Sequence, residues 1–275
     1  MTAADRWREQ LASWAIPDEI VAAAPEPPWG YSAELFRRRA EGALGSAPTP
    51  TTRRALDALP EGGTVLDIGV GGGAMSLPLS QRAGTIVGLD GQADMLTMFR
   101  SSAEAAGVEV RTVLGTWPDA AGQVEVADVV LAGHVAYNVS ELGSFAVAMG
   151  ARARRRVLLE LTERHPLSWM GPLWVHFHGL TRPSGPTAED ACAVLDEVGI
   201  RAGRDDRLVT ADEAGGGFLR REDAIHLVRK RLCLSADRDE EIAELLGTDL
   251  RQVGDLWDVG PEERIIITLW WDPVA

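Results

Sequence analysis

Short apolar runs alternate with helical patterns along the chain from about residue 60 onwards. The runs are rich in valine, isoleucine and leucine, and several lack polar alternation, which is typical of strands buried on both faces of a sheet. The candidate strands are 64–68, 85–90, 108–114, 126–132, 156–162 and 264–271, with a weaker one at 204–210. The helical patterns lie at 74–82, 92–106, 140–151 and 187–198. Because strand and helix alternate with short connections, the pattern predicts a doubly wound α/β fold.

The first 59 residues follow a different pattern. They contain helical stretches separated by the proline-rich PEPPWGY at 25–31 and no candidate strand. We therefore expect a helical N-terminal extension, or cap, over residues 1–59, in front of an α/β domain over 60–275.

Two insertions interrupt the α/β pattern. Residues 163–186 hold two tryptophans, three histidines and four prolines, which predicts a loop or short insertion. Residues 211–260 predict two helices, the second starting at a capping box formed by Asp237 and Glu240 and ending at Gly247.

The charge balance narrows the class of partner. A formal net charge of -14 argues against a large nucleic-acid surface, because phosphates must be met by cations. The basic run ARARRR at 151–156 is interpreted as the solvated end of a helix. No apolar run is long enough to cross a bilayer and the N-terminus lacks a secretory pattern, so a cytoplasmic protein is expected.

The stretch LDIGVGGGA carries the first chemical signal. It follows a candidate strand and places Gly69 and Gly71 in the G-x-G-x-x-A spacing of a dinucleotide-binding turn. Asp90 ends the next strand about twenty residues later, where a carboxylate can accept hydrogen bonds from both ribose hydroxyls. Two alternatives stay open: a purely structural glycine turn, and an Asx turn at Asp90.

Asp67 distinguishes between two nucleoside cofactors. A carboxylate two residues before Gly69 would repel the pyrophosphate of a nicotinamide dinucleotide. It would attract the ammonium and sulfonium groups of S-adenosylmethionine. A simple turn-capping role for Asp67 is the alternative.

VLDIGVGGG resembles motif I of the class I S-adenosylmethionine-dependent methyltransferases, with the pattern D/E-x-G-x-G-x-G. The resemblance covers about residues 60–162 well and extends weakly to the last strand. It implies a doubly wound, seven-stranded, mostly parallel sheet of the Rossmann-like methyltransferase fold, in the order 3-2-1-4-5-7-6. The helical N-terminal extension and the helical or loop insertions would be additions to that fold.

The same resemblance implies a cofactor site. Thr116 stands where the family often has an acidic residue for the adenine amino group, and Trp117 could stack on the adenine instead, although core packing is its alternative. The implied S-adenosylmethionine site comprises Asp67, Gly69, Gly71, Gly73, Asp90, Gly91, Met95, Thr116, Trp117 and Gly133.

The candidates for catalysis are histidine and tyrosine side chains. A general base is needed only if the methyl acceptor must lose a proton. His134 and Tyr137 follow the fourth strand, near the expected methyl position, and either could instead be structural. His176 comes from the insertion and shares one side with His178 if the chain there is extended. No third ligand is fixed by spacing, so no metal site is expected.

Aromatic residues outside the sheet pattern suggest an apolar lid over the acceptor, with packing between the extension and the sheet as the alternative. They are Trp14, Trp29, Tyr31, Trp169, Trp174 and Phe177.

The leading hypothesis is a methyltransferase that moves a methyl group in line from S-adenosylmethionine to a small, partly apolar molecule. The alternatives are an RNA or protein methyltransferase, a non-catalytic protein that binds the cofactor, and a nicotinamide-dependent oxidoreductase. No nucleic-acid or membrane partner is expected for the leading hypothesis.

Overall fold

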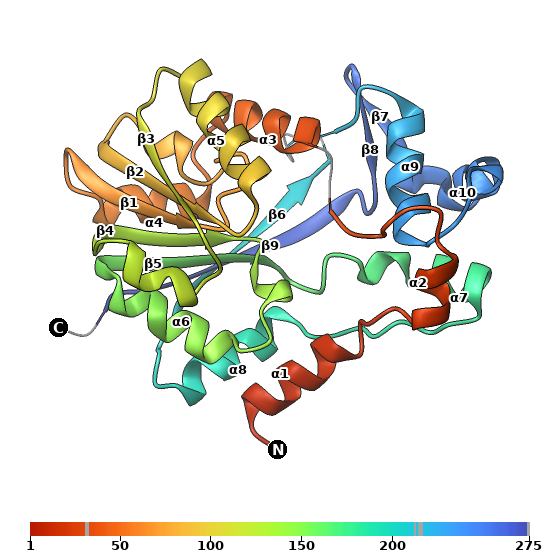
Figure 1. The fold of residues 1–275 in the computed structure, drawn as a ribbon, viewed down its shortest axis with the longest axis horizontal. Coiled ribbons are helices and arrows are strands. Elements are labelled where there is room, and N and C mark those ends of the chain that lie inside the picture. Colours follow the sequence, from red (N-terminus) through yellow and green to blue (C-terminus); the bar gives the residue numbers. More distant parts are fainter. Residues whose placement is uncertain (31–32, 212, 214–216, 274–275) are drawn as a thin grey trace.

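A seven-stranded sheet forms the centre of the protein (Figure 1). The computed structural model describes residues 1–30, 33–211, 213 and 217–273. The strands are β1 (Gly63–Ile68), β2 (Ala83–Asp90), β3 (Val110–Leu114), β4 (Ala127–Gly133), β5 (Ala153–Thr162), β6 (Gly203–Thr210) and β9 (Glu263–Trp271). Their order is β3-β2-β1-β4-β5-β9-β6; β9 runs antiparallel to both β5 and β6, and the other pairs of neighbours are parallel. The predicted doubly wound, mostly parallel, seven-stranded fold is therefore confirmed.

The described residues contain ten helices, which either pack against the sheet or form part of a smaller second lobe. They are α1 (Ala3–Ala12), α2 (Asp18–Ala23), α3 (Ala33–Gly45), α4 (Pro50–Ala58), α5 (Ala93–Ala105), α6 (Leu142–Ala151), α7 (Gly171–His178), α8 (Ala188–Glu197), α9 (Arg221–Arg231) and α10 (Asp239–Leu246). Short 3₁₀ turns are η1 (Leu77–Leu79), η2 (Asp119–Gln123), η3 (Ala136–Asn138), η4 (Ser168–Met170), η5 (Ala236–Arg238) and η6 (Gly247–Asp249). None of the helices in these described ranges is long and apolar enough to cross a membrane.

The two faces of the sheet are covered by separate apolar layers. One layer packs α1, α6 and α8 against the strands and includes Trp7 and Phe145. The other packs α4 and α5 and includes Leu59 and Phe99. Both layers bury the central strands, which explains why those strands are apolar without alternation.

The N-terminal residues contribute to both layers. The Trp7 side chain in α1 is fully buried, and its Nε1 donates to the Val139 carbonyl at 2.8 Å. Ala55 of α4 lies in the layer on the opposite face. The helical character of this segment is as predicted, while its treatment as a separate cap stays a prediction.

The helix predicted at 74–82 does not form. Only η1 lies there, and it is flanked by turns. Pro78 has no N–H to donate to the Ala74 carbonyl, so a regular helix would lose a hydrogen bond at this point. The glycine turn therefore leads into turns and a 3₁₀ segment, without the helix N-terminus that a phosphate would need.

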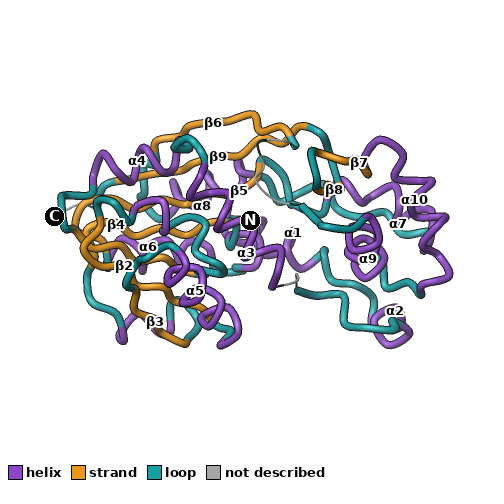
Figure 2. The backbone as a smooth tube through the Cα atoms, turned by 90° about the horizontal axis from the view of Figure 1, so that it is seen from above, coloured by secondary structure: helices purple, strands orange, loops and turns teal. Residues whose placement is uncertain are grey.

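A second lobe lies beside the sheet, at the other end of the molecule in Figure 2. It packs α2, α7, α9 and α10 with the hairpin of β7 (Leu250–Val253) and β8 (Leu256–Val259) around its own apolar cluster. The hairpin was not predicted, and residues 163–186, predicted as a loop, contain α7. The two predicted helices between 211 and 260 are confirmed as α9 and α10.

Two local predictions within these segments are wrong. Arg238 is the N-cap of α10 and makes no side-chain cap bond, because Asp237 accepts a hydrogen bond from the Ser235 hydroxyl instead. The basic run at 151–156 mostly enters β5, where Arg156 pairs with Asp272 at 2.7 Å.

Candidate functional site

The carboxyl ends of β1, β2 and β4 meet at one edge of the sheet. Parallel pairing places Asp67 of β1 opposite Leu131 of β4, and Ile68 opposite Leu89 of β2. The segments that follow these strands must therefore lie side by side. They contain the glycine turn (residues 69–73), Asp90 and His134.

Asp90 joins two of these segments. One carboxylate oxygen, Oδ2, accepts a hydrogen bond from the Gly71 N–H at 3.1 Å, and Oδ1 accepts one from the Gln92 N–H at 2.9 Å. The bond to Gln92 is the Asx turn considered from the sequence. Each carboxylate oxygen keeps further lone pairs, so Asp90 can still accept ribose hydroxyls.

The surface next to Asp90 contains the residues predicted around the adenine. Gly91 faces Thr116, since a Cβ atom built on Gly91 would lie 3.7 Å from Thr116 Oγ1. Met95 is half-buried in the first turn of α5. Leu114, which pairs with Asp90 across the strands, is 56% exposed. The sequence interpretation missed Leu114, although it is an apolar residue ending a parallel strand.

Asp67 lies inside the protein and not at the mouth of the turn. Its carboxylate is 1% exposed and accepts a hydrogen bond from the Ser76 hydroxyl at 2.6 Å. Burial raises the pKa of Asp67 to about 7, the charge of Asp90 adds to that rise, and the bond from Ser76 opposes it. The sequence-based choice of cofactor treated Asp67 as an exposed anion, and that premise is corrected here.

The glycines of the turn are required by packing within the protein. Gly69 has a φ of 71°, and a Cβ atom there would lie 2.5 Å from Val135 Cγ1. A Cβ atom on Gly72 would lie 2.6 Å from the Phe36 carbonyl oxygen of α3. Gly73, with a φ of 88°, meets the Phe99 ring. Packing within the protein therefore excludes a side chain at these three glycines even without a cofactor. This supports, for part of the turn, the alternative of a purely structural glycine turn.

His134 follows β4 directly and has an unusual backbone. Its φ is 58°, a left-handed value that is uncommon for a residue other than glycine. Its N–H donates to the Glu160 carbonyl at 2.8 Å, and its Nε2 lies 3.1 Å from Glu160 Oε1. The His134 side chain is half-exposed, whereas the Glu160 side chain is 9% exposed. Gly133, beside it, contacts Met75.

Glu160 was missed in the sequence and occupies a buried polar cluster. The Thr51 hydroxyl of α4 donates to Glu160 Oε2 and lies 2.6 Å from the Thr268 hydroxyl of β9. Burial alone would raise the pKa of Glu160, but His134, Thr51 and the charge of Arg207 outweigh it and hold the pKa below its usual range. A charged residue inside the apolar run RVLLELT was the available signal.

The contacts of Tyr137 favour the structural alternative over the predicted catalytic role. Its hydroxyl donates to the Thr162 carbonyl at 2.7 Å, and its ring stacks on Trp7 with centroids 5.7 Å apart. Burial raises the pKa of Tyr137, which makes its ionisation harder still. Tyr137 is a packing residue here.

His176 lies in α7 of the second lobe. Because α7 is helical and not extended, His176 and His178 point to different partners: His176 Nε2 lies 2.8 Å from Glu241 Oε1, and His178 Nε2 lies 2.7 Å from the Leu232 carbonyl. Both contacts lie within the second lobe, and a catalytic role for His176 stays a prediction.

Trp117 packs in the core and does not cover the adenine surface. Its side chain is buried in the same apolar layer as Phe145, and Nε1 donates to the Phe145 carbonyl at 3.2 Å. These contacts favour the packing alternative over the predicted stacking role.

The predicted aromatic lid is also largely packing. Trp14 is buried and stacks on His165 with centroids 3.8 Å apart, and Trp174 belongs to the apolar cluster of the second lobe. Trp29 is 55% exposed. Tyr31 lies outside the described residues.

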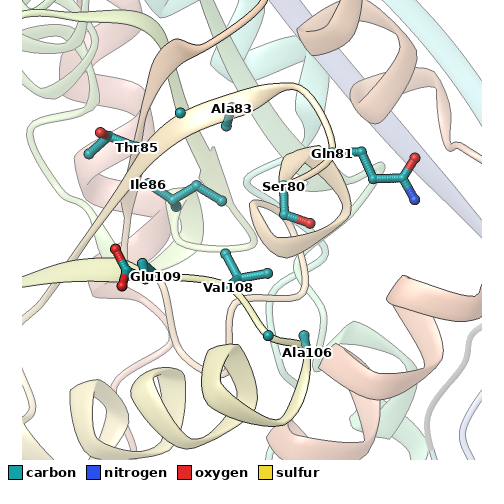
Figure 3. A pocket seen from close by; sticks show the side chains of 10 residues that line it. Ser80, Gln81, Ala83, Thr85, Ile86, Ala106, Val108 and Glu109 are labelled. Atoms are coloured by element: carbon teal, nitrogen blue, oxygen red, sulfur yellow. The ribbon is translucent and has the colours of Figure 1, made fainter.

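A cavity of about 290 Å³ lies elsewhere, at the amino ends of β2 and β3 (Figure 3). Its walls come from residues 80–81, 83–86 and 106–109, and Glu109 is the one titratable side chain among these lining residues. The strands begin here, whereas the glycine turn and Asp90 lie where they end. This cavity is therefore separate from the candidate site.

Comparisons with known proteins agree with the fold. Residues 65–155 match a family model described as a methyltransferase domain. Two curated relatives are named ubiquinone biosynthesis O-methyltransferase. The one from Azorhizobium caulinodans is 40% identical over 81 residues, which is 30% of this chain and 32% of that protein. The one from Paramagnetospirillum magneticum is 34% identical over 156 residues, covering 51% of this chain and 60% of that protein.

A solved structure from Bacillus halodurans, described as that of a candidate methyltransferase, shares the fold. It has a TM-score of 0.52 at 14% identity and covers 82% of this chain and 99% of its own. By contrast, this chain spans less than two thirds of the length of the two curated relatives above.

The fold is that of a Rossmann-like α/β protein, and the edge described above is its candidate nucleoside site. Residues 65–155 form a methyltransferase domain by their family match, and the observed sheet order is the one that the resemblance to class I S-adenosylmethionine-dependent methyltransferases implies.

Polar and apolar groups of the kind that S-adenosylmethionine needs meet at this edge, although Asp90 itself is only 9% exposed. Asp90 offers carboxylate lone pairs for ribose hydroxyls, and Leu114 offers an apolar surface beside Gly91 and Thr116 for adenine. Because Asp67 is buried, its carboxylate would act on the cationic end of the cofactor across the glycine turn and not by direct contact.

Proposed function

We propose that this protein transfers a methyl group from S-adenosylmethionine to a small, partly apolar molecule, by direct in-line displacement. One observation carries the proposal. Asp90, bonded to the glycine turn, and the half-exposed His134 follow strands that flank β1 on either side at one edge of the sheet. A nucleoside site and a proton acceptor are thus provided at neighbouring positions.

The chain's own residues would orient the reactants. Asp90 would hold the ribose, and Gly91, Met95, Leu114 and Thr116 would border the adenine. The methionine end would lie near Gly69, Gly71, Gly133 and, beneath the surface, Asp67. The cofactor supplies the methyl group, and the protein supplies orientation and electrostatics.

A small hydroxyl-bearing acceptor is favoured over a macromolecule. The curated relatives carry the name O-methyltransferase. The basic run at 151–156, the candidate docking surface for RNA, is partly neutralised, because Arg156 pairs with Asp272 and Arg155 lies 3.5 Å from Asp128. These ion pairs and the net charge of -14 weaken the RNA alternative. A cytoplasmic location is part of the same proposal.

Calorimetric titration of the full chain with S-adenosylhomocysteine, the demethylated product, tests the proposal. Saturable binding is expected. A folded sample that shows no heat of binding at millimolar ligand contradicts it. Titration with reduced nicotinamide dinucleotide is the matched control, and binding of that ligand instead would favour an oxidoreductase.

A further inference from the structure

Glu160 and His134 form a pair whose two members differ sharply in exposure. The carboxylate is buried at the carboxyl end of β5, and the imidazole is half-exposed at the end of β4. We propose that Glu160 is a positioning residue that orients His134 as the proton acceptor for a phenolic hydroxyl in the methyl acceptor. This inference rests on the proposed function and adds the proton-transfer residues to it.

The geometry fixes which nitrogen of His134 is available. An ionised carboxylate only accepts hydrogen bonds, so the Nε2 atom facing Glu160 Oε1 at 3.1 Å must carry a proton. In the neutral ring the lone pair then belongs to Nδ1. A half-exposed side chain can present that lone pair to a bound molecule.

The carboxylate itself is held from several elements. Thr51 from α4 donates to Oε2, Thr268 from β9 lies next to Thr51, and Arg207 from β6 contributes a positive charge. The His134 backbone N–H is bonded to the Glu160 carbonyl as well. A carboxylate fixed in this way restrains the imidazole and stabilises the imidazolium that forms when it accepts a proton, as an orienting carboxylate does in a catalytic triad.

Proton transfer and methyl transfer both take place at the acceptor oxygen. The acceptor O–H bond breaks and its proton moves to His134 Nδ1, while the oxygen electron pair forms the new bond to the methyl carbon. The bond between that carbon and sulfur breaks, and its electrons stay on sulfur, which becomes the neutral thioether of S-adenosylhomocysteine. The imidazolium later releases its proton to water.

A phenolic hydroxyl is the acceptor that most needs this pair. Its pKa is close to the value of about 10 for tyrosine, so it is protonated near neutral pH and its oxygen is a weak nucleophile until the proton is removed. An aromatic thiol is already largely ionised at pH 8 and needs no base. If His134 acts as a base, its loss should slow methylation of the phenol but not of the thiol. If the pair only supports the structure of the site, methylation of both acceptors should slow.

The test measures transfer of a labelled methyl group at pH 8 to catechol and to thiophenol. Wild type, Glu160→Gln and His134→Asn are compared, because asparagine tolerates the left-handed backbone at 134. Asp128→Asn is the matched control, since it makes the same acid-to-amide change on β4 away from this edge. Removing a general base costs about 10²–10⁴-fold, so kcat on catechol is expected to fall by about a hundredfold or more in both site variants.

Three further results are expected. Thiophenol methylation and the affinity for S-adenosylhomocysteine stay near wild type in both site variants. The acid limb of the catechol pH profile moves to lower pH in Glu160→Gln, because a protonated imidazole has lost its counter-charge. The double variant is no slower than His134→Asn, because residues that act as a unit are not additive.

Different results would contradict the proposed function, the phenolic acceptor and the role of Glu160. Absence of S-adenosylhomocysteine binding by wild type defeats the proposed function itself. Binding without catechol methylation overturns the phenolic acceptor and leaves the cofactor site standing. Equal losses on both probes, or additive losses in the double variant, make the pair structural and overturn the role of Glu160.

Discussion

The Ser76 hydroxyl donates to the buried Asp67 carboxylate across 2.6 Å, directly beneath the glycine turn. Ser76 belongs to the segment that should have been helical, and Asp67 belongs to β1. The bond therefore ties the turn to the strand that precedes it. It also removes from solvent the acidic group on which the sequence-based choice of cofactor depended.

Asp67→Asn should change how stability depends on pH. Because the pKa of Asp67 is raised to about 7 in the folded protein, the folded state keeps a proton that the unfolded chain has released above its ordinary pKa of 3.8. The stabilisation is fully present below that ordinary value and is lost as pH rises through about 7, with a total on the order of 4 kcal/mol.

Urea unfolding of Asp67→Asn and wild type at pH 5 and pH 8 measures this effect. The variant should lose less stability than wild type between the two values, because an amide does not titrate. Asp94→Asn, an exposed carboxylate in the first turn of α5, is the control and should follow wild type. Parallel pH slopes for Asp67→Asn and wild type would show that Asp67 is charged in the folded protein.

Asp90→Ala should weaken S-adenosylhomocysteine binding by about tenfold or more. A hydrogen bond to a charged group contributes roughly 1.5–3 kcal/mol net, which exceeds the value for a tenfold change. Calorimetry gives the dissociation constants, with Asp94→Ala as the control. An unchanged dissociation constant in a folded Asp90→Ala sample refutes the ribose assignment.

Gly69→Ala should cost more stability than Gly62→Ala. Both glycines have similar left-handed φ values, 71° and 68°, but a Cβ atom on Gly62 has nothing within 4 Å whereas one on Gly69 meets Val135. The shared backbone strain costs about 1–2 kcal/mol, and overpacking adds about 1–3 kcal/mol at Gly69 alone.

Chemical unfolding of both variants gives the comparison, and Val135→Ala combined with Gly69→Ala adds a second check. The double variant should recover part of the excess loss, because the clashing methyl group is gone. If the two single variants lose the same stability, the contact between Gly69 and Val135 is not what requires glycine.

Trp117→Phe should reduce stability but leave the cofactor site intact. The variant keeps an aromatic ring in the core and loses the hydrogen bond from Nε1 to the Phe145 carbonyl, a loss of about 1 kcal/mol. Thermal unfolding measures the loss and calorimetry measures S-adenosylhomocysteine affinity. A large drop in affinity without a drop in stability would restore the adenine-stacking role.

The sequence by itself determined the sheet and the edge at which the candidate site residues meet. Strands such as 64–68 and 126–132 are apolar because both faces are buried, and this pattern is local enough to be seen without a structure. Asp90 was identified for a similar reason, since its place at a strand end and its distance from the glycines follow from chain order alone. The hydrogen bond between Asp90 and Gly71 joins two segments that this spacing had already brought to one edge.

Only the tertiary structure decided how individual side chains are used. Asp67 is buried because Ser76 and the turn close over it, and Trp117 faces α6 because the chain after β3 turns towards the core. The pairing of His134 with Glu160 joins residues of two different strands, and no local period or spacing encodes it. Exposure, charge state and partner depend on distant segments that pack together, and these properties became visible only in three dimensions.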